Sequence, residues 1–436
     1  MREWLNRMGT VAAGRSGASG NALGLFLANA AAQSLSFAAY PVLTRIYRPD
    51  QLGVLSVVLF GMTLLMPLAT LRYELALPLC RDDAEARNVL ATCFAVVVGT
   101  SLCLAGGLLA VPGRLLSDAG PAAQFRLFIP VALLAFGTYT VLVYEASRVG
   151  RYDEIARTRV SQAAVGPLLQ ILFGVVGFGT TGLLTGFVLG LSSGSARLAR
   201  RILGGRAGLF AGVSARSVGA VASKYRRFAL FSSWSGVLAG SASLGNIVFT
   251  LLYGATVGGY LFLADRILMQ PLRVSGNAFL QVFVGEAGRT LQTEPGRLRA
   301  MFVDVFRKQA VICCLWLGAI YAGAHVLVPL VFGAAWADST PYIDVMLIGY
   351  LPMAAAIPTA HALQLIHSQR LSAALETLRF AALVAAIGAA WAAGLAPLRA
   401  ALAYSVVQAA ANGLILLVTY VRVCQVAAAA PAHDGR

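Results

Sequence analysis

Charged residues are scarce in this sequence. Asp, Glu, Lys and Arg together make up 12% of the 436 residues, whereas 58% are hydrophobic and the mean hydropathy is +0.75. A soluble globular protein carries about 25% charged residues, so this composition excludes an ordinary soluble fold. It indicates a polytopic membrane protein instead, because each membrane span needs about 20 consecutive apolar residues.

Lysine and the motifs of nucleotide and metal chemistry are also nearly absent. Lys224 and Lys308 are the two lysines, and neither follows a glycine-rich loop, so the chain has no P-loop and does not itself drive transport with ATP. No nucleophile elbow and no zinc motif occur. We expect no enzyme activity, no metal and no cofactor. The cysteines lack metal-ligand spacing and are expected to be small core residues: Cys80, Cys93, Cys103, Cys313, Cys314 and Cys424.

Apolar segments of span length run through the whole chain. We predict twelve spans, at roughly 20–44, 52–78, 88–111, 124–147, 160–179, 182–203, 228–253, 257–285, 309–332, 340–366, 370–394 and 398–421. The connections are short except for the basic one between the sixth and seventh spans. The sequence thus predicts an all-α protein of about 12 transmembrane helices. Its expected domains are an N-terminal six-helix lobe (1–203), a basic cytoplasmic linker (204–227) and a C-terminal six-helix lobe (228–436).

The basic residues crowd into alternate connections. Roughly 25 of the 34 lie in the termini and in every second loop, which is the positive-inside bias and predicts that both termini are cytoplasmic. This distribution argues against a nucleic-acid partner despite the net charge of +16. The block from Arg197 to Arg227 is either a topological anchor that touches anionic lipid or a dedicated partner site. The first apolar stretch, from about Asn21, lacks a cleavage site and is expected to be an anchor, not a signal peptide.

A faint internal repeat supports the two lobes. Tyr47 and Gly53 frame the turn between the first two spans, and Tyr253 and Gly259 frame the turn between spans seven and eight with identical spacing. Six spans separate the turns, so the two lobes are expected to have the same orientation and to be related by an axis along the membrane normal.

Charged residues inside the first two spans are candidates for function, because each charge costs about 2.5–3.5 kcal/mol to place in a membrane. Arg72 and Glu74 lie in the second span among apolar residues. Residues two apart point to different faces of a helix, so one or both should face a hydrated cavity or a charge on another helix. Arg45 lies at the extracytoplasmic end of the first span, where it either caps helix carbonyls or has a specific role.

The eighth span carries Asp265, Arg266 and Arg273. The two arginines are seven residues apart and thus lie on one face of a helix, about 10 Å from each other. Such cations need an anion, which is either a bound pyrophosphate, matched by the guanidinium fork, or Asp265 acting as an internal partner. Glu376 and Arg379 in the eleventh span are three residues apart and are expected to form an ordinary interfacial pair.

Five segments carry motifs of a known family. Three lie in the first half: Pro-Val-Leu-Thr-Arg-Ile-Tyr-Arg-Pro-Asp-Gln-Leu-Gly (41–53), Thr-Leu-Arg-Tyr-Glu-Leu-Ala-Leu-Pro (70–78) and Asp-Asp-Ala-Glu-Ala-Arg-Asn-Val-Leu (82–90). Two lie in or just after the eighth span: Gly-Tyr-Leu-Phe-Leu-Ala-Asp-Arg-Ile-Leu-Met-Gln-Pro-Leu (259–272) and Gln-Val-Phe-Val-Gly-Glu-Ala (281–287). These segments resemble bacterial polysaccharide flippases of the multidrug/oligosaccharidyl-lipid/polysaccharide exporter superfamily, and the last two are similar to its eighth-span signature. The span arrangement matches over nearly the whole chain, and the motifs over roughly a sixth of it.

The resemblance implies two six-helix lobes around a cationic central cavity that opens alternately to either side. Its implied cargo is an undecaprenyl-pyrophosphate-linked oligosaccharide, an O-antigen, capsule or exopolysaccharide unit, moved from the cytoplasmic to the periplasmic leaflet of a bacterial inner membrane. We expect Arg72, Arg266 and Arg273, with Arg45, to contact this cargo as cavity cations. Glu74 and Asp265 would balance their charge or carry a coupling proton. Other expected partners are membrane lipids and polysaccharide-assembly proteins such as the polymerase, and the energy source is a proton or sodium gradient.

Three rival functions stay open. A drug or cation exporter of the same superfamily would favour an acidic cavity over a basic one. An O-antigen polymerase or membrane glycosyltransferase would need a sizeable extracytoplasmic loop, and the extracytoplasmic connections here are short. A scaffold in a glycan-assembly complex, without transport of its own, is the third.

Overall fold

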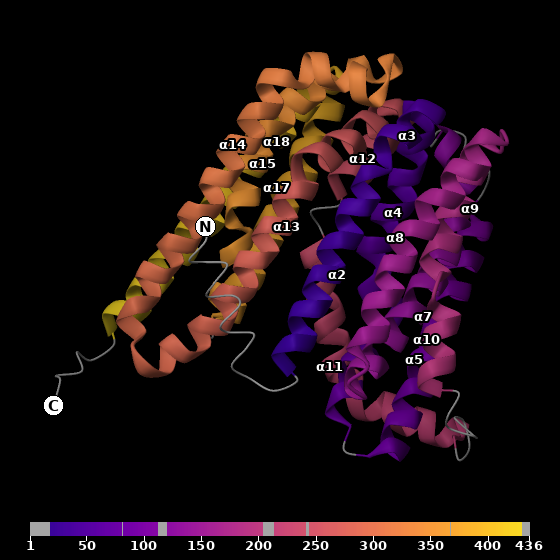
Figure 1. Cartoon of the computed structure of the whole chain (residues 1–436), viewed down its shortest axis with the longest axis vertical. Coiled ribbons are helices and arrows are strands. Elements are labelled where there is room, and N and C mark those ends of the chain that lie inside the picture. The colour runs from indigo at the N-terminus through magenta and orange to yellow at the C-terminus, as the bar shows by residue number, and fades with distance from the viewer. Residues whose placement is uncertain are drawn as a thin grey trace. The chain divides into compact units, whose positions relative to one another are not determined.

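All secondary structure in the described part of the chain is helical. The computed structural model describes residues 18–80, 82–111, 120–203, 213–240, 244–366 and 368–429, which form α-helices and short 3-10 helices without a strand (Figure 1). The predicted all-α class is confirmed.

The helices follow one another with short connections. From the N-terminal side they are α2 (Ala18–Ala38), α3 (Tyr40–Ile46), α4 (Pro49–Thr70), η1 (Tyr73–Leu79), α5 (Asp83–Ala110), η2 (Gly120–Phe125), α7 (Phe128–Arg148), α8 (Tyr152–Val175), α9 (Gly179–Ser192), α10 (Ser195–Leu203) and α11 (Ala215–Ala239). The second half contains α12 (Leu244–Tyr253), α13 (Ala255–Thr293), η4 (Pro295–Arg297), α14 (Leu298–Phe332), η5 (Ala334–Ser339), α15 (Thr340–Ala356), η6 (Ile357–Thr359), α16 (Ala362–Leu365), α17 (Gln369–Ala392) and α18 (Pro397–Ala429).

Several of these helices can cross a membrane. Within the described residues, 7 segments are long and apolar enough to do so: Pro49–Thr70, Asp83–Ala110, Phe128–Arg148, Leu298–Phe332, Ala334–Leu365, Gln369–Ala392 and Pro397–Ala428. The other five predicted spans coincide with helices that are shorter, interrupted or more polar. These are α2 with α3, α8, α9 with α10, α11 with α12, and α13. The chain is therefore a multi-pass helical membrane protein.

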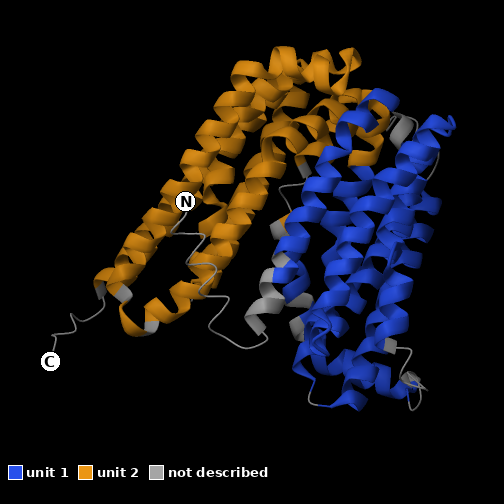
Figure 2. Ribbon diagram, in the orientation of Figure 1, with its two compact units in different colours: residues 1–47, 57–237 blue, residues 48–56, 238–436 orange. Residues whose placement is uncertain are grey.

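The chain divides into two compact units (Figure 2). Unit 1 comprises residues 1–47 and 57–237, and unit 2 comprises residues 48–56 and 238–436. The first turns of α4 thus belong to unit 2, and α11 begins at Ala215, within the segment predicted as a linker. The boundaries predicted for the two six-helix lobes and their linker stay a prediction.

The sixth predicted span, at 182–203, is divided by a turn. Gly194 has a φ of +77°, which glycine adopts at little cost, and it separates α9 from α10. Helix α10 is amphipathic: Leu198 and Ile202 are buried, whereas Arg197 and Arg201 lie 3.4 and 3.9 Å from carboxylate oxygens of Glu154. An amphipathic helix with an arginine face is suited to the membrane surface rather than to its interior.

Glycine allows helices of unit 1 to approach one another at backbone distance. A methyl group placed on Gly190 of α9 would lie 2.4 Å from the Cα atom of Gly166 in α8. No side chain fits there, so the two helix backbones are in direct contact, as small residues permit in membrane proteins.

Candidate functional site

The second predicted span breaks at the residues that carry its charges. Helix α4 ends at Thr70, and the next two residues, Leu71 and Arg72, have φ angles of +46° and +57°. They are the non-glycine residues with left-handed backbone among those described. Each such residue costs about 1–2 kcal/mol, and backbone strain of this kind clusters at functional sites. The helix break therefore marks this segment as a candidate site.

Polar side chains hold the break in place. The Thr70 hydroxyl donates to Glu74 Oε1 (3.2 Å) and accepts from the backbone N–H of Arg72 (3.2 Å). Thr70 and Glu74 are both buried, and Tyr73 anchors the following turn by donating its hydroxyl to the carbonyl of Ala222 (3.0 Å). The prediction that Arg72 and Glu74 point apart assumed a continuous helix, but α4 ends at Thr70, before both residues, and a 3-10 helix begins at Tyr73, between them.

The guanidinium of Arg72 lies against a glycine of another helix. A methyl group on Gly236 of α11 would lie 2.6 Å from Arg72 Nη2 and 2.8 Å from Pro67 Cβ. Among the described residues, no carboxylate pairs with Arg72, and neither Arg72 Nε nor Glu74 Oε2 has a hydrogen-bond partner although both atoms are buried. A half-buried cation without a carboxylate can accept an anion from outside the chain. The role of Gly236 carries no sequence signal, since nothing marks it among the other glycines.

In unit 2, Asp265 has two partners. Its Oδ1 accepts from the Tyr350 hydroxyl (3.0 Å) and from Arg273 Nη2 (3.5 Å), whereas its buried Oδ2 has no hydrogen-bond partner in the described chain. The Asp265 side chain is 5% exposed and that of Arg273 is 37% exposed. The pair is long and only half shielded, so Arg273 can still turn towards another anion.

Arg266 is arranged differently. Its Nη1 donates to Gln270 Oε1 (3.4 Å), and its guanidinium carbon lies 4.9 Å from the centre of the Phe262 ring, a cation–π contact. Of the two expected cations of α13, Arg273 is thus the one beside Asp265, and Arg266 packs on an aromatic ring. The partner Tyr350 was missing from the sequence prediction because it comes from α15, 85 residues away.

A proline removes one backbone hydrogen bond from α13 between these charges. Pro271 has no N–H to donate to the carbonyl of Ile267, and the indole Nε1 of Trp316 in α14 donates to that carbonyl instead (3.2 Å). Pro271 precedes Arg273 by two residues, and the Arg273 side chain reaches back past it to Asp265. Arg45 lies elsewhere, exposed in the last turn of α3, where a cation favours the helix dipole.

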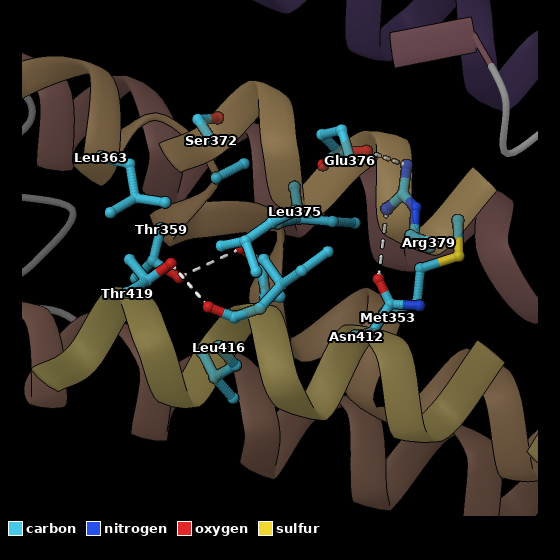
Figure 3. Close-up of a pocket in the computed structure, with 14 residues that line it drawn as sticks. Met353, Thr359, Leu363, Ser372, Leu375, Glu376, Arg379, Asn412, Leu416 and Thr419 are labelled. Carbon is cyan, nitrogen blue, oxygen red and sulfur yellow. Dashed lines mark hydrogen bonds and ion pairs between the residues drawn. The ribbon is translucent and has the colours of Figure 1, made fainter. Parts of the chain in front are cut away.

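Unit 2 also contains a cavity of about 200 Å³ between α15, α17 and α18 (Figure 3). Arg379 lies in its wall, 2.5 Å from Glu376 Oε2, and its Nη1 donates to Asn412 Oδ1 (3.3 Å). The predicted Glu376–Arg379 pair therefore forms, but in a cavity wall rather than on an open surface. Because the carboxylate neutralises the guanidinium, this cavity has no excess positive charge to attract a polyanion.

The cysteine beside the helix break is a weak nucleophile, and the described residues contain no metal cluster. Within the residues that the structure describes, no group of three or more His, Cys, Asp or Glu side chains could hold a metal ion. Cys80 follows η1, beside the helix break, and burial raises the pKa of its thiol to about 11. It is therefore protonated near neutral pH and is not a ready nucleophile.

Fold and charges together define a multi-pass helical membrane protein with cations inside its helical units, and the comparisons with solved structures agree on the fold. The chain has a TM-score of 0.72 to an inward-closed lipid II flippase MurJ, at 9% identity over 93% of this chain and 90% of that one. It has a TM-score of 0.66 to an inward-facing multidrug resistance MATE transporter of the MOP superfamily, at 16% identity over 91% and 96%.

A third similar structure is a MOP-superfamily transporter from Pyrococcus furiosus, described as having a binding pocket of reverse polarity. Its TM-score is 0.53, at 15% identity over 93% of this chain and 96% of that one. No protein-family model and no curated protein match the chain. At these identities the similarity establishes the fold, which is that of MATE and MurJ transporters.

Proposed function

We propose that this protein is a flippase that moves an undecaprenyl-pyrophosphate-linked oligosaccharide from the cytoplasmic to the periplasmic leaflet of a bacterial inner membrane by alternating access. The observation that carries the proposal is the guanidinium of Arg72, held at a strained helix break without a carboxylate partner among the described residues. A pyrophosphate is a fitting ligand, because its oxygens match the guanidinium fork.

Arg273 is the second cation of the proposed site. Its side chain is 37% exposed and its contact with Asp265 is long (3.5 Å), so an incoming phosphate or acidic sugar can compete for the guanidinium. Arg266 and Arg45 would attract the pyrophosphate through their positive charge and would not hydrogen-bond to it directly. Glu74 and Asp265 would balance these charges or carry the coupling proton, and the energy would come from a proton or sodium gradient rather than from a bound cofactor.

One comparison supports the transported class, because a similar structure is a lipid II flippase. Within the proposed scheme, membrane lipids and polysaccharide-assembly proteins such as the polymerase are the other partners. The O-antigen, capsule or exopolysaccharide nature of the glycan is part of the proposal.

Gene deletion followed by mass analysis and leaflet accessibility of undecaprenyl-linked glycans tests the function. Complete single repeat units trapped in the cytoplasmic leaflet would support flipping. Single units exposed on the periplasmic side would indicate a polymerase and contradict the proposal.

Complementation of the deletion tests the site. We expect Arg72→Ala to lose export. Arg72→Lys should recover part of it, because lysine restores the positive charge but not the two-pronged guanidinium. The matched control is Arg422→Ala, which is exposed on α18 and should export normally. Export by Arg72→Ala at the level of the control would remove the basis of the proposal.

A second candidate, a drug or cation exporter, is favoured by the similarity to multidrug resistance MATE transporters. It predicts normal glycans and altered sensitivity to toxic cations in the deletion strain. The half-buried cations Arg72, Arg266 and Arg273 count against it, because a cationic drug is attracted by an acidic site.

A further inference from the structure

A buried carboxylate of unit 1 lies among three exposed arginines. Glu154, in the first turn of α8, has a side chain that is 5% exposed. Its oxygens lie 3.7 Å from Arg157 Nη1, 3.4 Å from Arg197 Nε and 3.9 Å from Arg201 Nε. The first of these arginines belongs to α8 and the other two to α10. We call Arg157, Arg197 and Arg201 the arginine cluster.

The arginine cluster has more positive charge than Glu154 can neutralise. One carboxylate faces three guanidinium groups, and all three contacts are longer than the 2.7–2.9 Å or so of a strong charge-assisted hydrogen bond. The neighbouring carboxylate, Asp153, is exposed and pairs with no arginine in the described part of the chain. The three arginine side chains are 55–60% exposed, so their other N–H groups can bind an anion from outside the chain.

The two helices that carry the arginine cluster are fixed to each other. The hydroxyls of Ser161 in α8 and Ser193 just before α10 lie 2.7 Å apart. Leu198 and Ile202 of α10 belong to the same buried hydrophobic cluster as Ile155 of α8. The backbone positions of the arginines are therefore set before any ligand arrives, which reduces the cost of ordering them on binding.

Helix α10 is suited to the level of the membrane at which lipids carry their phosphate groups. With 9 residues it is too short to cross a bilayer core of about 30 Å. One face packs into unit 1, and the other carries Arg197, Arg200 and Arg201, as in helices that lie along a membrane surface. The anion found there is the phosphodiester of a lipid headgroup, whose oxygens match the guanidinium fork.

We propose that the arginine cluster is a binding site for the headgroup of an anionic phospholipid such as phosphatidylglycerol, and that the bound lipid holds α10 on the membrane surface. Glu154 positions the arginines, and the lipid phosphate supplies the negative charge that this carboxylate lacks. A free phosphate ion offers similar oxygens but has no acyl chains to keep it at the surface. The proposal goes beyond the proposed function and does not depend on the identity of the cargo.

Thermal unfolding of the purified protein in detergent tests the site. Phosphatidylglycerol should raise the melting temperature of the unchanged protein, relative to the same amount of phosphatidylcholine. A variant with all three residues of the arginine cluster changed to Gln should lose this increase. It also carries Glu154→Gln, so that no buried carboxylate is left unpaired. Each variant is compared with itself in the two lipids, so a general loss of stability does not affect the result.

The matched control changes three exposed arginines of unit 2. A variant with Arg289→Gln, Arg307→Gln and Arg422→Gln removes the same charge and should keep the full increase. Equal increases in the two variants, or no increase in the unchanged protein, would overturn the proposal.

Lipid titration followed by native mass spectrometry gives a second readout. Each arginine near an anionic lipid contributes about fivefold to binding, so the cluster variant should bind phosphatidylglycerol roughly 100-fold more weakly than the control variant. Inorganic phosphate at the same concentration should not compete with the lipid. Equal affinities of the two variants, or displacement of the lipid by inorganic phosphate, would refute a lipid site.

The lipid site and the cargo site can fail separately. Arg72→Ala removes the proposed cargo contact and should keep the full effect of phosphatidylglycerol, because Arg72 is not part of the arginine cluster. If the cargo is different but the lipid site exists, gene deletion leaves undecaprenyl-linked glycans unchanged while phosphatidylglycerol still raises the melting temperature. If the cargo is as proposed but the lipid site does not exist, deletion traps repeat units while the two lipids act alike.

Discussion

At the scale of single residues, a missing side chain defines the candidate site as much as a charged one does. Gly236 leaves the space that the guanidinium of Arg72 occupies, and the left-handed backbone at Leu71 and Arg72 directs the arginine there. The left-handed backbone and the space beside Gly236 are both needed, because either one alone would leave the guanidinium of Arg72 without a defined position.

Gly236→Ala is expected to abolish export as far as Arg72→Ala does. The new methyl group would lie 2.6 Å from Arg72 Nη2 and displace it, although alanine is the better helix former by about 1 kcal/mol. Complementation of the deletion strain measures the effect. Gly219→Ala in the same helix, with nothing within 4 Å, is the control, and equal export by both variants would contradict the prediction.

A buried ion pair in α7 allows a stability prediction. Arg148 binds both oxygens of the buried Glu145 at 2.8 Å and also contacts the exposed Asp83 at 2.8 Å. Arg148→Ala leaves a buried charge unpaired and should cost about 3–5 kcal/mol. Asp83→Ala should cost at most about 1 kcal/mol, because exposed pairs contribute little.

Thermal unfolding of the purified variants in detergent checks this order. A double variant, Glu145→Met with Arg148→Met, should recover most of the stability that Arg148→Ala loses, because it removes both charges of the pair. Equal melting temperatures of Asp83→Ala and Arg148→Ala would show that the buried pair is not the cause.

The charged residues were predictable from the sequence, but their partners were not. Arg72, Glu74, Asp265, Arg266 and Arg273 stand out because charge is rare in apolar segments. Gly236 and Tyr350 come from distant helices, and only tertiary packing brings them to the charges. The roles assigned to the charges stay a prediction.

At the scale of elements, Trp316 of α14 supplies the hydrogen bond that Pro271 removes from α13. Trp316→Phe removes the donor to the Ile267 carbonyl that Pro271 leaves without its helical partner, which should cost about 1 kcal/mol. We expect a melting temperature lower by about 2 °C. The exposed Trp391 in α17 provides the control, and an equal shift in Trp391→Phe would exclude the hydrogen bond as the cause.

Helix positions were predictable, whereas their interruptions were not. Apolar length alone locates spans such as those of α5, α7 and α17 within a few residues. The break after Thr70 could not be predicted from a glycine, because Leu71 and Arg72 adopt the left-handed backbone there. The predicted span at 182–203 missed the turn at Gly194, because the apolar residues of α9 suggested one continuous span. The arginine face of α10 could have indicated that the span ends before it.

At the scale of the whole molecule, the positive-inside bias predicts which connections face the periplasm. In a cysteine-free variant, Ala335→Cys, exposed in η5, should react with an impermeant thiol reagent added to spheroplasts. Glu294→Cys, exposed after α13, should react only once the membrane is permeabilised. The opposite pattern would invert the proposed orientation and with it the direction of transport.

The helix break also determines how mutagenesis of this segment must be interpreted. After Arg72 the chain continues as a 3-10 helix, in which residues three apart are aligned, and its buried residues are Tyr73, Glu74, Ala76 and Leu77. A helical wheel drawn over 52–78 therefore assigns wrong faces to the residues from 71 onwards. Sensitive positions in a mutational scan should therefore recur every three residues beyond the break, and an assumed period of 3.6 residues would assign buried side chains to the lipid.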